Sequence, residues 1–169
     1  GTVWMQGRSW RGDVPVTLTV VSGFPSYGPR SGTSFNQISN NLAILNVNGG
    51  TYELTTLQKR YLNLYHENLK HIDVNSDELL NTLELKGGNA VWAQIEWDHD
   101  DDPGTPALIV DIINVQDAGM VGTYYGQTIA NDADCNFDGK VNVQDLALVG
   151  GNYNLTNLAA YGIGDAIWD

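Results

Sequence analysis

Hydrophobic and polar side chains alternate along much of the first half of the chain. Residues 14–21 (VPVTLTVV) and 51–57 (TYELTTL) carry β-branched, aromatic and leucine side chains spaced as in half-buried strands. The NGG sequence at 48–50 is a turn signal before the second run. Further strand-like runs lie at 2–6, 42–47, 60–65 and 80–85. This spacing predicts an all-β sandwich over residues 1–88.

The pattern changes after the KGGN sequence at 86–89, which marks a domain boundary. In residues 89–169, acidic clusters precede two segments with apolar residues at helical spacing. These residues are Ala118, Val121 and Tyr125 in one segment, and Leu146, Val149 and Tyr153 in the other. Helices of two to three turns do not persist alone in water, so we expect them to pack on each other. The sequence therefore predicts two domains, the second a small α module.

The second half contains an internal repeat. The sequence NVQD at 114–117 recurs at 142–145. The segments that follow, AGMVGTYYGQT and LALVGGNYNLT, share Val, Gly and Tyr at matched positions. We interpret this as a duplicated loop–helix unit.

The loop of the second repeat has the spacing of an EF-hand calcium loop. Calcium takes about six to eight oxygen ligands, and alternate residues of a wrapped loop can turn short carboxylates and amides inward. Here Lys140 would contribute its backbone carbonyl, Asn142 a bound water, and Asp145 both carboxylate oxygens. Positions 1, 3, 5, 6, 7, 9 and 12 are Asp134, Asn136, Asp138, Gly139, Lys140, Asn142 and Asp145.

The first repeat carries an insertion. Its alternating acids are Asp98, Asp100 and Asp102, and its positions 9 and 12 are Asn114 and Asp117. Residues 103–111 stand where a single glycine belongs, but long loops close at small entropic cost. We therefore expect a second calcium ion here, with two alternatives open: a vestigial loop, or a frame that starts at Glu96. Two further candidate ligands are Asp111 and the carbonyl of Ile112.

The charge distribution limits the kinds of ligand that the chain is expected to bind. The net charge is −12; residues 1–88 hold seven acidic and seven basic residues, whereas residues 89–169 hold thirteen acidic residues and one base, Lys140. Such a half repels nucleic acids and anionic membranes, and a bound cation would relieve its self-repulsion. One cysteine and three histidines leave oxygen as the ligand type, which favours calcium or magnesium. The sequence has no long apolar run that predicts membrane insertion.

The second repeat, DADCNFDGKVNVQDLALVGGNY, and more loosely DHDDDPGTPALIVDIINVQDAGMVGTYY, resemble the calcium loop and exiting helix of dockerins. The resemblance implies calcium-dependent binding to a cohesin domain, as in the extracellular, polysaccharide-degrading cellulosomes of bacteria. It also implies that the chain belongs to a larger secreted polypeptide. Partner contacts would come from Val115 and Gln116, or from Val143 and Gln144, in two orientations related by the repeat. Nearby candidates are Leu146, Val149, Ala118 and Val121.

The first half resembles carboxypeptidase regulatory-like, prealbumin-like sandwiches through GGTYELTTLQKRYL, which implies a spacer or X-module-like packing partner. No nucleophile-elbow, zincin or phosphate-loop motif occurs, so we expect no catalysis. A free calcium sensor is disfavoured, because the chain has two methionines and no helix pattern before either loop. A carbohydrate-binding module stays open on the aromatic residues Trp4, Trp10, Tyr27 and Tyr52.

Overall fold

The structure is a computed structural model. It describes residues 2–7, 15–23, 30–33, 50–56, 58–64, 71–74, 82–91, 94–97, 108–128 and 131–161. The described strands are β1 (Thr2–Met5), β2 (Pro15–Gly23), β3 (Arg30–Thr33), β4 (Gly50–Thr55), β5 (Arg60–Tyr61), β6 (His71–Val74), β7 (Thr82–Leu85), β8 (Gly87–Asn89), β9 (Gln94–Trp97) and β10 (Leu108–Asp111). The described helices are α1 (Val115–Tyr124), α2 (Val143–Gly151) and α3 (Asn157–Tyr161).

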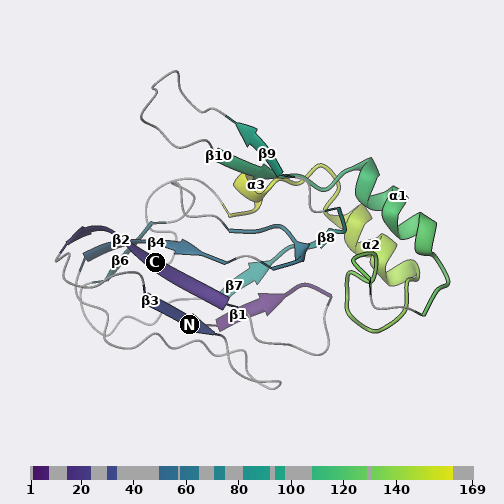
Figure 1. Cartoon of the computed structure of the whole chain (residues 1–169), viewed down its shortest axis with the longest axis horizontal. Coiled ribbons are helices and arrows are strands. Elements are labelled where there is room, and N and C mark those ends of the chain that lie inside the picture. The colour runs from purple at the N-terminus through teal and green to yellow at the C-terminus, as the bar shows by residue number, and fades with distance from the viewer. Residues whose placement is uncertain are drawn as a thin grey trace.

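Strands dominate the first half. Four of them form an antiparallel sheet in the order β3-β2-β4-β6, and β1 pairs with β7 in parallel. In β2, Val16 and Leu18 are buried while Thr17 between them is partly exposed, which is the alternation expected of a strand with one face on the core. Leu54 of β4, which pairs with Leu18, is also buried. Figure 1 shows this sheet at one end of the molecule and helices α1 and α2 at the other.

The predicted strands at 2–6, 14–21, 51–57, 60–65 and 80–85 each overlap a strand of the structure, whereas 42–47 lies outside the described residues. Strands β3, β6 and β8 were not predicted. The second half also holds an unpredicted antiparallel hairpin, β9–β10, directly before α1. The chain therefore mixes strands and a few helices; α1 and α2 lie where the apolar spacing indicated, whereas α3 was not predicted.

Helices α1 and α2 are joined by two backbone pairings related by the repeat. Around Val141, the Gly126 N–H donates to the Val141 carbonyl at 2.8 Å and the Val141 N–H donates to Gln127 at 2.9 Å. Ile113 is the equivalent residue of the first repeat. The Asn154 N–H donates to the Ile113 carbonyl at 2.8 Å, and the Ile113 N–H donates to the Leu155 carbonyl at 3.1 Å. We call these two pairings the clasps. Each clasp ties the segment before one helix to the segment after the other.

The helices pack closely on the strand half. The Asn152 side-chain amide after α2 donates to the Gly87 carbonyl at 2.7 Å, and the Tyr161 hydroxyl of α3 donates to the Leu62 carbonyl at 2.6 Å. Buried apolar side chains from both halves form one cluster. The predicted boundary after residue 88 falls inside β8, and the division into two domains stays a prediction.

Gly88 of β8 lies directly against the backbone of α2. Its φ is +102°, and a Cβ added there would lie 2.9 Å from the backbone nitrogen of Val149 in α2. Both the left-handed backbone and the rigid neighbour exclude a larger residue. The glycine therefore permits α2 to rest on β8.

We predict that Gly88→Ala lowers the free energy of unfolding by about 1–3 kcal/mol, through overpacking and backbone strain. Urea denaturation measures the effect. The matched control is Gly119→Ala in α1, where an added Cβ meets nothing within 4 Å; it should stabilise the protein by about 0.5–1 kcal/mol, because alanine favours helix. Equal effects of the two substitutions would contradict this packing.

Candidate functional site

Helices α1 and α2 begin with the same capping box. The Asn114 side chain accepts a hydrogen bond from the Gln116 N–H at 2.7 Å, and the Asp117 carboxylate accepts one from the Asn114 N–H at 2.7 Å. The same bonds recur in the second repeat at Asn142 and Asp145, at 2.7 and 2.8 Å. This arrangement satisfies N–H groups that a helix start leaves without partners. Positions 9 and 12 of both predicted loops therefore lie at helix starts.

The loop before α2 wraps around its own acidic side chains. The Asp134 carboxylate accepts hydrogen bonds from the Asp138 N–H at 3.1 Å and the Gly139 N–H at 3.0 Å. Gly139 has a φ of +85°, which gives the sharp turn that the sequence pattern required. The Asn136 side-chain oxygen accepts from the Asp138 N–H at 3.0 Å, and the Asp138 carboxylate accepts from the Lys140 N–H at 2.9 Å.

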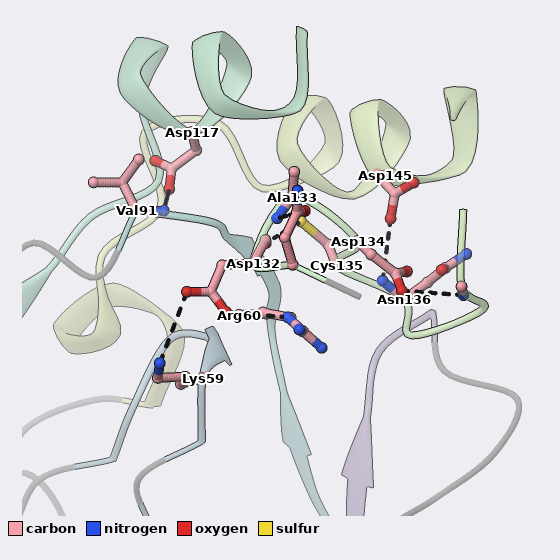
Figure 2. Close-up of polar contacts among 12 residues, drawn as sticks. Lys59, Arg60, Val91, Asp117, Asp132, Ala133, Asp134, Cys135, Asn136 and Asp145 are labelled. Carbon is pink, nitrogen blue, oxygen red and sulfur yellow. Dashed lines mark hydrogen bonds and ion pairs between the residues drawn. The ribbon is translucent and has the colours of Figure 1, made fainter. Parts of the chain in front are cut away.

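Asp145 closes this loop from the helix side. Its Oδ1 accepts a hydrogen bond from the Asn136 N–H at 3.2 Å, which Figure 2 shows below α2. The side-chain amides of Asn136 and Asn142 donate to Asp138 Oδ2 at 3.3 and 3.5 Å. Asp134, Asn136 and Asp145 are buried, whereas the Lys140 side chain is exposed. The structure thus brings the six predicted ligand residues of the second repeat into one loop.

The loop concentrates negative charge. Burial raises the pKa of Asp134, and the nearby Asp145 carboxylate raises it further, while N–H donors of the loop and Arg60 oppose the rise. Among the described residues, no three acidic, histidine or cysteine side chains are gathered tightly enough to hold a metal as they stand. The donors are nonetheless carboxylate and amide oxygens, whose spare lone pairs suit a hard divalent cation. The loop's chemistry therefore fits calcium.

Residues of the strand half contact this loop. Arg60 Nε lies 3.5 Å from an Asp132 carboxylate oxygen, and Lys59 Nζ lies 3.8 Å from the other. The Arg60 guanidinium also lies 3.8 Å from the centroid of the Phe137 ring, which stacks on Tyr61 at 6.4 Å. These contacts were not predicted from the sequence, in which the adjacent bases Lys59 and Arg60 were their signal. They stabilise the loop from its outer side.

In the first repeat, the Asp117 carboxylate has a different hydrogen-bond donor from that of Asp145. Its Oδ1 accepts a hydrogen bond from the Val91 N–H at 2.9 Å (Figure 2). Burial raises the pKa of Asp117, and backbone N–H donors, of which Val91 is the strongest, oppose the rise. Asp111 is buried, and its Oδ2 accepts from both the backbone N–H and the side-chain amide of Asn63 at 3.0 Å. Ile112 forms an isolated antiparallel bridge with Thr156.

The hairpin β9–β10 occupies part of the predicted first loop. In its register Asp111 pairs with Gln94, and Leu108 pairs with Trp97. Trp97 and Leu108 therefore lie at the end of the hairpin that is remote from α1. Glu96, the start of the alternative frame, lies within β9. The predicted acids Asp98, Asp100 and Asp102 lie outside the described residues.

Two equivalent exposed pairs begin the helices. Val115 is 67% exposed and Val143 is 64% exposed, and each is followed by an exposed glutamine, Gln116 or Gln144. We call Val115–Gln116 and Val143–Gln144 the valine–glutamine pairs. The clasps set the start of each helix beside the end of the other. Two tyrosines at those helix ends, Tyr125 and Tyr153, are also exposed.

The other predicted contact residues are less accessible. Ala118 and Leu146 are partly buried and pack against the core cluster. Val121 is 0% exposed and Val149 is 2% exposed, so these two side chains are core residues. The resemblance placed them near a partner; the structure instead turns them inward, because the short helices bury this face.

Of the aromatic residues considered for sugar binding, Tyr52 is buried and Trp4 is 36% exposed. Trp10 and Tyr27 lie outside the described residues. Among the described helices, none has the length and apolar character needed to cross a membrane.

No protein family and no curated protein matches this sequence. Solved structures that resemble it in fold include two of the type II cohesin–X-dockerin complex from Acetivibrio cellulolyticus. A chain of the N-terminal interface mutant shares 18% identity at a TM-score of 0.55, with 91% of this chain and 93% of that chain covered. A chain of the C-terminal interface mutant shares 17% identity at a TM-score of 0.53, with 91% and 96% covered. The chain therefore has a fold found in cohesin–dockerin complexes.

The single thiol, Cys135, lies inside the second loop and offers a direct probe of it. It is buried, and burial raises its pKa to about 12. At pH 8 such a thiol holds about a thousandfold less thiolate than one with a pKa of 9.0, and thiolate is the reactive form. We predict that iodoacetamide alkylates Cys135 at least about a hundredfold more slowly in the native protein than in urea. Similar rates in both conditions would contradict the buried position.

Proposed function

We propose that this chain is a non-catalytic, calcium-dependent docking module of the X-dockerin kind, which binds a cohesin-type partner protein. The observation that carries the proposal is the pair of equivalent, exposed valine–glutamine pairs at the starts of two clasped helices. An exposed valine at each helix start has no role in the core, and apolar side chains ringed by polar ones are typical of contact surfaces. The proposal assigns these pairs to the partner.

The fold neighbours belong to complexes that contain both a cohesin and an X-dockerin. The repeats favour the dockerin side for this chain. Its second half contains two capped helices that begin with the same NVQD sequence, and the second follows a loop with EF-hand spacing. A strand half packs against these helices, in keeping with an X-module placed before a dockerin. We include a β-sandwich over residues 1–88 and a boundary near residue 88 in this proposal.

Calcium would bind in the second loop. Asp134, Asn136, Asp138 and Asp145 would provide side-chain oxygens, Lys140 its carbonyl, and Asn142 a bound water. The ion would supply positive charge where burial and Asp145 raise the pKa of Asp134. It would thereby hold the start of α2, and with it Val143 and Gln144, in the binding position.

The proposed setting is extracellular. Calcium is abundant there, so a structural site would stay filled. By the resemblance, the chain would attach a larger secreted bacterial polypeptide to a scaffold or cell-surface protein in an assembly that degrades polysaccharides. The strand half would serve as a spacer and packing partner for the helices.

The test replaces the valine–glutamine pairs and measures binding to a type II cohesin by calorimetry in calcium. We predict that Val115→Ala/Gln116→Ala with Val143→Ala/Gln144→Ala together weaken binding at least about a hundredfold, because exposed apolar anchors dominate such interfaces. Each double variant alone should weaken binding less than about tenfold if both orientations are used. A large loss in one double variant would assign a single orientation.

Glu84→Gln is the matched control, because Glu84 is exposed on β7 and belongs to neither valine–glutamine pair. It should bind like the unmodified chain. Undiminished binding by the fourfold variant, with circular dichroism unchanged, would refute the docking surface. Absence of binding by the unmodified chain to a panel of type II cohesins would refute the partner class.

A further inference from the structure

Asp117 and Asp145 are equivalent residues with different partners. Each is position 12 of its repeat and each accepts the N–H of the capping asparagine. The second oxygen distinguishes them. Asp145 Oδ1 accepts from the Asn136 N–H, within its own loop. Asp117 Oδ1 accepts from the N–H of Val91, a residue that precedes the hairpin β9–β10 in the chain.

The surroundings of the two carboxylates differ in the same way. Asp145 faces a loop that also contains Asp134 and Asp138, and the Asp145 charge acts on Asp134. Asp117 is 1% exposed, and its described neighbours include the N–H groups of Val91, of Ala90 and of its own helix start. Both carboxylates accept a backbone N–H on each oxygen, but the second donor to Asp145 belongs to the loop itself, whereas the second donor to Asp117 belongs to the segment that follows β8.

The other two described ligand candidates of the first repeat also make contacts outside the loop. Asp111 Oδ2 accepts from both nitrogens of Asn63, and the Asp111 N–H donates to the Asn157 side chain at 3.0 Å. Ile112 lies in the bridge with Thr156. These contacts connect the base of the hairpin to the strand half and to α3. In a calcium loop, by contrast, the same residues would point toward one ion.

We infer that the first repeat has replaced its calcium site with a carboxylate–amide strut from Asp117 to Val91, so that the chain binds one calcium ion, in the second loop. The inference rests on the proposed calcium binding of that loop. The strut fixes the start of α1 to the strand half, whereas an ion fixes the start of α2. The two valine–glutamine pairs are therefore supported by different means, and only one of them depends on calcium.

The experiment counts bound calcium by calorimetry on the whole chain and on two matched variants, Asp117→Asn and Asp145→Asn. The unmodified chain should bind one ion. Asp117→Asn should still bind one ion with affinity within about threefold, and Asp145→Asn should bind none. Two ions on the unmodified chain would overturn the inference and leave the docking proposal standing. No ion at all would refute the calcium part of the proposed function itself.

Thermal melts in calcium and in chelator test the strut separately. Asp117→Asn should lower the melting temperature by about 4 °C or more in both solutions, because a charge-assisted bond is lost whether or not calcium is present. The rise in its melting temperature on adding calcium should equal that of the unmodified chain. Asp145→Asn should lose that rise. An unchanged melting temperature for Asp117→Asn would overturn the strut; if this variant does not fold, the ion count of the unmodified chain still decides the inference.

Discussion

The two clasps are the constraint on which the second half depends. Helices of ten and nine residues are too short to persist alone. Backbone hydrogen bonds through Ile113 and Val141 join the segment before each helix to the segment after the other. Because these bonds link main-chain atoms, they depend little on the side chains around them. They fix the helix starts relative to each other, and thereby bring both valine–glutamine pairs to the surface.

The strand half completes this arrangement. Gly88 allows α2 to rest on β8, and the Tyr161 hydroxyl accepts the Lys86 N–H at 3.1 Å while it donates to Leu62. Arg60 and Phe137 connect the same half to the second loop. The loop and both helices are therefore supported from one side, which leaves the opposite faces of α1 and α2 available to a partner. In the proposed docking, the strand half would have a structural role even without contacting the partner.

Local patterns predicted α1, α2, several strands and the residues of the second loop, but not α3. Helical spacing located α1 and α2, and the EF-hand spacing gathered Asp134 through Asp145 because those residues are close in sequence. The hairpin β9–β10 was missed, since its acids were interpreted as ligands and its pairing depends on residues across an insertion. The Asp117–Val91 bond and the Arg60–Phe137 contact join distant segments, and a single sequence carries no signal for such pairings. Val121 and Val149 show a related ambiguity: a short amphipathic helix does not reveal which apolar residues face the core and which face a partner.

Amide hydrogen exchange of the chain with and without a type II cohesin, in calcium, would locate the docking surface. We expect binding to slow exchange at the starts of α1 and α2, around the two valine–glutamine pairs, and to leave exchange in the sheet β3-β2-β4-β6 unchanged. Protection confined to that sheet, with both helix starts unaffected, would contradict the assignment of the docking surface to the clasped helices.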